Sequence, residues 1–198
     1  MVDTDDAGGI AGVVLTGGAS RRMGRDKATL EVDGIAMARR VANALSAVSC
    51  TPILAVGGDP DRLRSLALPV LADRWPGEGP LGAIITALEH LCGPGFEKKL
   101  DGVVIAACDL PWLGAVTLSE LVQTSLQHPE SDVVVASTDR LEPLCAVWHR
   151  SALPIISTCF DAGERAVHAV LSQLVVLTCA VDPRSLVNVN GPDDLSRG

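Results

Sequence analysis

The architecture of the chain can be predicted from one segment near its start, Ile10-Ala-Gly-Val-Val-Leu15-Thr-Gly-Gly-Ala-Ser20-Arg-Arg-Met-Gly-Arg25-Asp-Lys27. Its first six residues are apolar without alternation, which is typical of a strand buried on both faces. The glycines that follow allow backbone N–H groups to turn toward a bound anion with no Cβ in the way. Four basic residues then lie within seven positions: Arg21, Arg22, Arg25 and Lys27. This order predicts a polyphosphate site, whereas the alternative is a solvated basic loop.

The overall charge makes this basic cluster informative. The 198-residue chain carries a net charge of −8, so it must gather positive charge locally to bind a polyanionic small molecule. The same charge disfavours binding to nucleic acid or to an anionic membrane, and 3% aromatic residues with no Tyr disfavour a base-stacking single-strand binder. The segment is no Walker A loop, because no Gly directly precedes Lys27 and no Ser or Thr follows it, and it is not G-x-G-x-x-G.

Further apolar segments alternate with helical patterns along the chain. Strands are expected at 10–15, 52–56, 69–72, 102–107, 132–136, 143–149 and 174–181, and helices at 35–48, 83–92, 114–127, 150–160 and 164–172. Strands that lack strict alternation and are separated by helices predict a Rossmann-like three-layer α/β sandwich with a mostly parallel central sheet. The strand at 143–149 is expected to be antiparallel, because only a short loop precedes it.

The chain is expected to form one domain over residues 10–198, preceded by a flexible tail over residues 1–9. The acidic, Gly-rich start resembles no signal peptide, and no apolar run approaches the ~18 residues of a membrane span. The six cysteines fit neither a C-x-x-C pair nor a zinc spacing, so we expect buried free thiols in a reducing cytoplasm.

Two further segments fall where parallel strands are expected to end, the edge at which such sheets bind ligands. Asp109, in Cys108-Asp-Leu-Pro111, follows the strand at 102–107 and is a candidate Mg²⁺ ligand, with a helix N-cap as the other interpretation. The loop Asp73–Gly82 is rich in Gly and Pro and leads into a helix N-terminus. It is a candidate for recognition of a base or phosphate, or an ordinary connector.

Two amides stand near the end of the sequence, in Asn188-Val-Asn190-Gly-Pro192-Asp193. Because they are two positions apart on an extended segment, they are expected to point the same way and to ligate a metal or bind phosphate. Asn-x-Asn is also ordinary turn chemistry.

Taken together, these segments resemble the molybdenum cofactor guanylyltransferase family of nucleotidyltransferases. Family motifs match at Leu15–Lys27, Asp73–Gly82, Cys108–Pro111, Pro143–Arg150, Gly163–Arg165 and Asn188–Asp194, which together span nearly the whole chain. Two positions depart from the pattern. Thr16 stands where the family usually has Ala, and Gly57 stands where some members have an Asn that reaches guanine.

The resemblance implies that the terminal phosphate of molybdopterin attacks the α-phosphate of GTP, which gives the guanine dinucleotide cofactor and pyrophosphate. It implies that Arg22 and Lys27 hold the β- and γ-phosphates, that Asp109 anchors Mg²⁺ with Asn190 as a possible second ligand, and that Asp73 accepts hydrogen bonds from guanine. The further nucleotide contacts that it implies are Leu15, Thr16, Gly17, Gly18, Gly57, Gly79, Pro80 and Leu81. An ionised phosphate needs no general base, so His149 and His168 are expected to be packing or substrate-edge residues.

Two other functions are consistent with these residues. One is a guanylyl- or cytidylyltransferase that acts on another phosphorylated acceptor, and the other is a nucleotide-binding regulatory protein without turnover. The expected partners are GTP and molybdopterin, with transient contacts to molybdoenzymes or other cofactor-synthesis proteins and none to nucleic acid or a membrane. The expected location is the cytoplasm.

Overall fold

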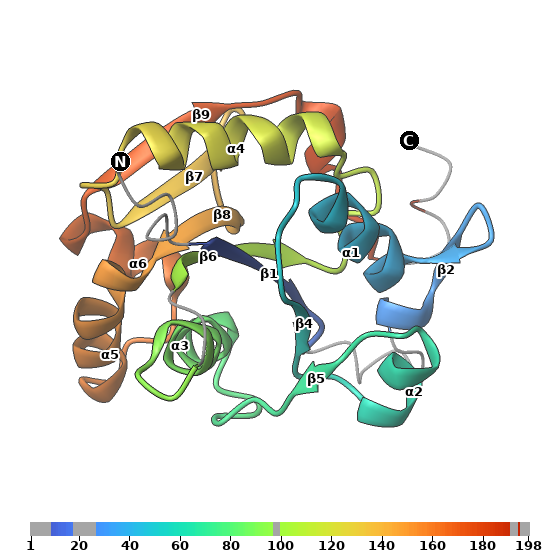
Figure 1. Cartoon of the computed structure of the whole chain (residues 1–198), viewed down its shortest axis with the longest axis horizontal. Helices are drawn as coiled ribbons and strands as arrows, with labels where there is room; N and C mark the ends of the chain where they lie inside the picture. Colours follow the sequence, from blue (N-terminus) through green and yellow to red (C-terminus); the bar gives the residue numbers. More distant parts are fainter. Residues whose placement is uncertain (1–8, 18–26, 97–99, 191–193, 195–198) are drawn as a thin grey trace, which may run out of the picture.

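The structure, a computed structural model, describes residues 9–17, 27–96, 100–190 and 194. Its centre is a seven-stranded sheet with the order β5-β4-β1-β6-β8-β7-β9 (Figure 1). The strands are β1 (Gly9–Leu15), β4 (Ile53–Val56), β5 (Val70–Leu71), β6 (Leu100–Ala107), β7 (Val133–Ser137), β8 (Leu141–His149) and β9 (Val176–Ala180). A separate hairpin pairs β2 (Glu31–Val32) with β3 (Ile35–Ala36).

One strand of the sheet runs against the others. β8 is antiparallel to both of its neighbours, β6 and β7, whereas the other pairings, β5–β4, β4–β1, β1–β6 and β7–β9, are parallel. The mostly parallel sheet and the antiparallel strand at 143–149 are therefore confirmed. Because the parallel strands share one direction, the loops that follow them leave the sheet at one common edge.

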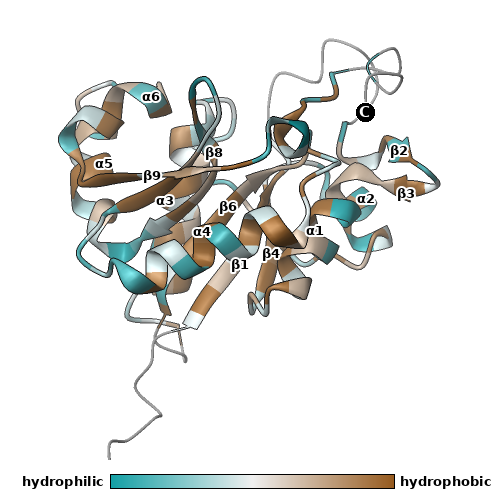
Figure 2. Cartoon of the chain, turned by 90° about the horizontal axis from the view of Figure 1, so that it is seen from above, coloured by the Kyte–Doolittle hydropathy of each residue, from teal (hydrophilic) through white to brown (hydrophobic). Residues whose placement is uncertain are grey.

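Helices cover both faces of the sheet (Figure 1). α1 (Met37–Ala47) and α4 (Ala115–Gln127) pack on one face, and α3 (Pro80–Cys92) and α5 (Leu153–Asp161) pack on the other. Val13 belongs to the core under α3 and Val14 to the core under α1, and both are 0% exposed. In Figure 2, α4 alternates hydrophobic and hydrophilic residues, as expected for a helix with one face on a sheet. The predicted three-layer sandwich is confirmed.

Several short helices complete the chain: α2 (Pro60–Ser65), α6 (Val167–Val170), η3 (Lys27–Thr29), η4 (Arg150–Ala152), η5 (Leu171–Gln173) and η6 (Pro183–Leu186). The expected helix at 35–48 begins later, because residues 35 and 36 form β3 after an Asp33-Gly34 turn with positive φ at both residues. The expected helix at 83–92 begins earlier, because Pro80 fits the first helical position. Residues 1–8 of the expected tail lie outside the described residues, and Gly9 belongs to β1 instead.

No helix within the described ranges is long and apolar enough to cross a membrane. All six cysteines are free, and all except the half-buried Cys92 are buried, as expected. Burial raises the pKa of the Cys50 thiol to about 11 and that of Cys145 to about 12. These two thiols therefore remain protonated at neutral pH and are poor nucleophiles.

His149 is a buried packing residue at the edge of the sheet away from the shared carboxyl ends, because it pairs with Gly102 near the start of β6. Its Nδ1 lies 2.6 Å from the carbonyl oxygen of Ser131, and its Nε2 lies 2.5 Å from Oγ of Ser125. A carbonyl oxygen only accepts, so Nδ1 carries the proton and Nε2 accepts from the Ser125 hydroxyl. The packing role expected for His149 is confirmed.

Replacing Ser125 by alanine should therefore destabilise the protein without affecting its ligand site. The change leaves the buried Nε2 of His149 without a donor, which costs about 1–3 kcal/mol of unfolding free energy. Urea denaturation measures this loss, and Ser119→Ala on the exposed face of the same helix is the matched control. A Ser125→Ala variant as stable as the control would contradict the tautomer assignment.

Candidate active site

The candidate site lies at the carboxyl edge of the sheet, which is the edge where the parallel strands end. It is centred on the neighbouring strands β1 and β6, from which the chain continues in opposite directions along the sheet. From β1 the chain proceeds to β4 and β5 on one side, and from β6 it proceeds to β7, β8 and β9 on the other. Such a switch point opens the crevice in which α/β sheets bind ligands. The N–H of Cys108 donates to the carbonyl of Leu15 at 3.0 Å, so the two diverging loops begin side by side.

The loop after β1 rests against the loop after β4. Thr16 is buried, and its hydroxyl lies 2.8 Å from the carbonyl oxygen of Gly57 and 3.1 Å from that of Val56. Gly57 has a φ of +77°, and a Cβ there would lie 3.0 Å from the Cα of Gly17. The two loops can approach this closely because position 57 is glycine, whereas a Cβ at Gly17 would lie 3.7 Å from the Cα of Gly57, an ordinary contact distance. Thr16 thus links two loops, and Gly57 offers the site its backbone alone.

Lys27, Asp109 and Asn190 converge at this edge of the sheet. The Nζ of Lys27 lies 2.6 Å from Oδ1 of Asn190 and 3.6 Å from Oδ2 of Asp109. The C-terminal segment reaches the loop after β6 through a backbone hydrogen bond of 2.9 Å from Val189 N to Asp109 O. The side chains of Lys27 and Asp109 are 21% and 25% exposed, so they are largely desolvated yet accessible.

The carboxylate of Asp109 needs a cation beside it. Burial raises the pKa of Asp109, and the ammonium of Lys27 opposes that shift. An N-cap role for Asp109 is wrong, because Gly114 occupies the N-cap of α4. A carboxylate and an amide oxygen placed around a cation are a donor set suited to Mg²⁺, which completes its shell with phosphate oxygens and water. The residues present therefore fit the ion, with the Lys27 ammonium in the position of the cation.

Asp73 begins the loop between β5 and α3. Its Oδ1 accepts a hydrogen bond of 3.0 Å from Trp75 N, and the hydroxyl of Thr86 on α3 lies 3.4 Å away. One carboxylate oxygen therefore anchors the loop to the helix. Gly79 is the N-cap of α3 with φ +90°, and Leu81 is fully buried in the core. Leu81 consequently has only backbone atoms to offer a ligand.

The candidate residues form a strip along the carboxyl edge. β6, β1, β4 and β5 are consecutive neighbours, and at a strand spacing of about 4.8 Å the ends of β6 and β5 lie about 14 Å apart. Asp109 follows one end of this strip and Asp73 the other, with Gly17 and Gly57 between them.

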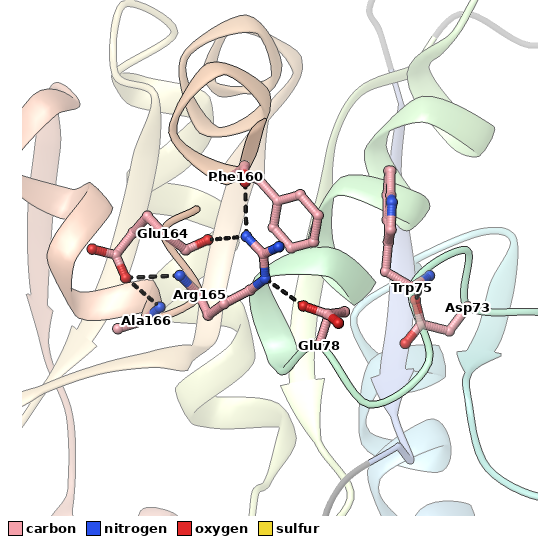
Figure 3. A network of polar contacts seen from close by, with 7 residues as sticks. All are labelled: Asp73, Trp75, Glu78, Phe160, Glu164, Arg165 and Ala166. Atoms are coloured by element: carbon pink, nitrogen blue, oxygen red, sulfur yellow. Dashed lines mark hydrogen bonds and ion pairs between the residues drawn. The ribbon is translucent and has the colours of Figure 1, made fainter. Parts of the chain in front are cut away.

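Two of the predicted residues, Gly18 and Arg22, lie outside the described residues, as do Arg21 and Arg25, so their roles stay predictions. Sequence reasoning gave no role to Arg165, although Gly163-Glu-Arg165 was one of the matching motifs. The structure places its guanidinium against the loop that starts at Asp73 (Figure 3).

Comparison with known proteins agrees with this geometry. Residues 12–177 match the MobA-like NTP transferase domain. The chain belongs to the MobA-like NTP transferase family. The molybdenum cofactor guanylyltransferase of Rhodobacter capsulatus is 34% identical, covering 95% of this chain and 94% of that protein. The probable molybdenum cofactor guanylyltransferase of Mycobacterium tuberculosis H37Rv is 33% identical, covering 91% and 89%.

Solved structures share the fold of this MobA-like chain. Molybdopterin-guanine dinucleotide biosynthesis protein A from Archaeoglobus fulgidus has a TM-score of 0.73 at 25% identity, covering 95% of this chain and 96% of its own. 2-C-methyl-D-erythritol 4-phosphate cytidylyltransferase from Thermus thermophilus has a TM-score of 0.69 at 14% identity, covering 96% of each chain. The MobA-like fold is thus similar to that of an enzyme named for a different base, and base choice must be argued from the site.

Proposed function

We propose that the protein transfers GMP from GTP to the terminal phosphate of molybdopterin, which forms molybdopterin guanine dinucleotide and releases pyrophosphate. The observation that carries the proposal is the convergence of Lys27, Asp109 and Asn190 at the switch point of the sheet. This cluster places a lysine ammonium beside two side-chain oxygens, and a metal-bound triphosphate needs both a cation for its phosphates and oxygen ligands for its metal. The names of the relatives at 33–34% identity support GTP and molybdopterin as the two substrates.

The chain's own residues act by positioning and by neutralising charge. An oxygen of the acceptor phosphate attacks the α-phosphorus in line, and the bond from that phosphorus to the bridging oxygen of the leaving pyrophosphate breaks. Lys27 and Arg22 hold the β- and γ-phosphates and neutralise the charge that gathers on pyrophosphate. Asp109 and Asn190 would hold Mg²⁺, which when bound would neutralise negative charge on the triphosphate. No side chain need remove a proton, because the attacking phosphate is already ionised.

The base is read at the other end of the strip. Asp73 accepts hydrogen bonds from the N1–H and N2–H groups of guanine, which adenine and cytosine do not present together. Backbone groups of Leu15, Thr16 and Gly17, with Gly57 opposite, line the path between base and phosphates. Gly79, Pro80 and Leu81 contribute the start of α3.

Product analysis tests this function directly. The protein is incubated with molybdopterin, Mg²⁺ and each of the four nucleoside triphosphates, and the nucleotide in the product is identified after chromatography. We expect a dinucleotide product with GTP. A product formed with CTP would instead indicate a cytidylyltransferase, and tight GTP binding without any product would indicate a regulatory protein.

Replacing Asp73 by asparagine should lower the preference for GTP over ATP by about ten- to a hundredfold. An amide places a donor where guanine also has one, and such a mismatch costs about 1–3 kcal/mol per group. The measurement is kcat/KM for both nucleotides with the same acceptor. Thr86→Val is the control, because it removes the hydroxyl beside Asp73 and keeps the carboxylate. An equal change of the ratio in both variants would mean that loop anchoring, and not base contact, is the role of Asp73.

A further inference from the structure

Arg165 lies in the turn between α5 and α6, with its side chain held in one position (Figure 3). One terminal nitrogen donates to the carbonyl oxygens of Phe160 at 2.7 Å and Glu164 at 2.9 Å. The Glu164 carboxylate in turn accepts from the backbone N–H groups of Arg165 and Ala166, each at 2.7 Å. The guanidinium is thus fixed by the turn to which it belongs.

From this position Arg165 reaches the loop that carries Asp73. Its Nε lies 2.6 Å from Oε2 of Glu78, 87 residues away in the sequence. The side chains of Arg165 and Glu78 are 40% and 51% exposed. An exposed ion pair contributes only about 0–1 kcal/mol to stability, so its main effect here is geometric.

A second connection runs through aromatic rings. The guanidinium carbon of Arg165 lies 3.9 Å from the ring centroid of Phe160, whose ring is in turn 5.0 Å from that of Trp75. The backbone N–H of Trp75 donates to Asp73. Gly82 of α3 permits this contact, because a Cβ there would lie 3.3–3.4 Å from Trp75 and Phe160. Arg165 therefore touches the loop both through Glu78 and through Phe160.

The loop needs such support. It follows β5, which has only two residues, and it contains Gly77 and Gly79 with φ of +91° and +90°. Most of its residues are exposed, so few apolar contacts hold it in place. A carboxylate that must meet two donors on one base edge tolerates little displacement.

We propose that Arg165 is a positioning residue, which braces the loop from Asp73 to Gly79 through Glu78 and Phe160 and thereby sets the preference for the guanine base. The inference rests on the proposed base-reading role of Asp73. It assigns Arg165 an effect on specificity without any contact between Arg165 and the nucleotide.

The test uses nucleotide binding to the whole protein, without an acceptor, so that its result is independent of transfer to molybdopterin. Dissociation constants for GTP and ATP are measured by calorimetry for wild type, Arg165→Met and Glu78→Gln. We expect each variant to lower the ATP-to-GTP ratio of Kd about tenfold, as typical for indirect coupling. The double variant should be no worse than either single one, because both changes remove the same brace.

Two further variants sharpen the test. Arg64→Met removes a comparable exposed ion pair on α2, with Asp61 at 2.7 Å, and should leave the ratio unchanged. Arg165→Lys should restore little, because an ammonium cannot bond two carbonyls and lie flat on a ring as a guanidinium does. In the free protein, hydrogen exchange at the amides of Trp75 and Glu78 should quicken in both brace variants.

Two results would overturn the proposal. One is that Arg165→Met and Glu78→Gln both keep the ATP-to-GTP ratio of Kd that the wild type has. The other is equal weakening of GTP and ATP by Arg165→Met while Glu78→Gln has no effect, because Arg165 would then contact the phosphates directly. Failure of the proposed function is a separate observation: no transfer to molybdopterin by wild type, whatever the Kd ratios are.

Discussion

An Asp109→Ala variant should lose transfer almost completely, with kcat reduced about a thousandfold. Asp109 presents its carboxylate to Lys27, whose ammonium also contacts Asn190, so its loss removes the proposed carboxylate ligand of the metal. Metal stabilisation of a transition state is worth several kcal/mol, and each 1.36 kcal/mol is tenfold in rate. Single-turnover kinetics at high and low Mg²⁺ measure the effect. Near-normal turnover at low Mg²⁺ would leave Asp109 with no role in catalysis.

At pH 7 the buried charge of the Asp109 carboxylate should lower the free energy of unfolding. An uncharged variant at this position should therefore be well folded, so a loss of its activity would not be due to misfolding. Burial raises the pKa of Asp109 in the folded state despite the nearby ammonium of Lys27. The stability contributed by such a group is full below its unfolded pKa and is lost as the pH rises through the folded pKa. Asparagine is uncharged at every pH, so Asp109→Asn should be at least as stable as wild type at pH 7. Urea denaturation at pH 7 and at about pH 3 tests this, and the difference should vanish in acid.

A Lys27→Met variant should bind nucleotide more weakly and metal ions more tightly. Charge-assisted hydrogen bonds to phosphates contribute about 1.5–3 kcal/mol, so the Kd for GTP should rise about ten- to a hundredfold. Without nucleotide, the ammonium occupies the space between Asn190 Oδ1 and Asp109 Oδ2, and its removal exposes both oxygens to a cation. Titration with Mn²⁺ in the absence of nucleotide measures this second effect.

The nucleotide and Mn²⁺ measurements distinguish two roles of Lys27, which are binding of the phosphates and competition with the metal ion. Lys27→Arg keeps the charge with a different shape, so it should restore nucleotide binding poorly while still hindering the metal. An unchanged Mn²⁺ affinity in Lys27→Met would show that the lysine does not compete with the ion. Equal affinity of wild type for GTP and guanosine would show that it does not hold phosphates.

Local sequence patterns predicted the sheet well. Uninterrupted apolar segments such as 102–107 identified strands covered on both faces, and the short loop before 143–149 identified the antiparallel one. Two local signals were missed although both were present. Asp33-Gly34 is typical of a tight hairpin turn, and Asp59-Pro60 is a capped helix start that now begins α2.

From the sequence alone, only those site residues that directly follow a predicted strand could be assigned to the site. Asp109 and Asp73 follow apolar segments, so their place at the carboxyl edge could be inferred. The contact between Lys27 and Asn190 joins residues 163 positions apart, and the brace from Arg165 to Glu78 joins residues 87 positions apart. No periodicity or spacing within one sequence encodes such pairings, because they depend on how loops from different strands meet.

Redesign of base choice should take account of how closely Gly17 and Gly57 approach. A side chain added at position 57 would come within 3.0 Å of the Gly17 backbone, so the loop after β1 would have to shift with it. Any change there alters phosphate binding and base recognition together, and a library of variants at this position should contain few active members. Most residues of the loop from Asp73 to Gly79 are exposed, so its positions other than Gly77, Gly79 and the Glu78 contact with Arg165 can accept new side chains. Directed evolution toward another nucleotide should therefore gather its successful substitutions at those positions of the loop and retain Gly57.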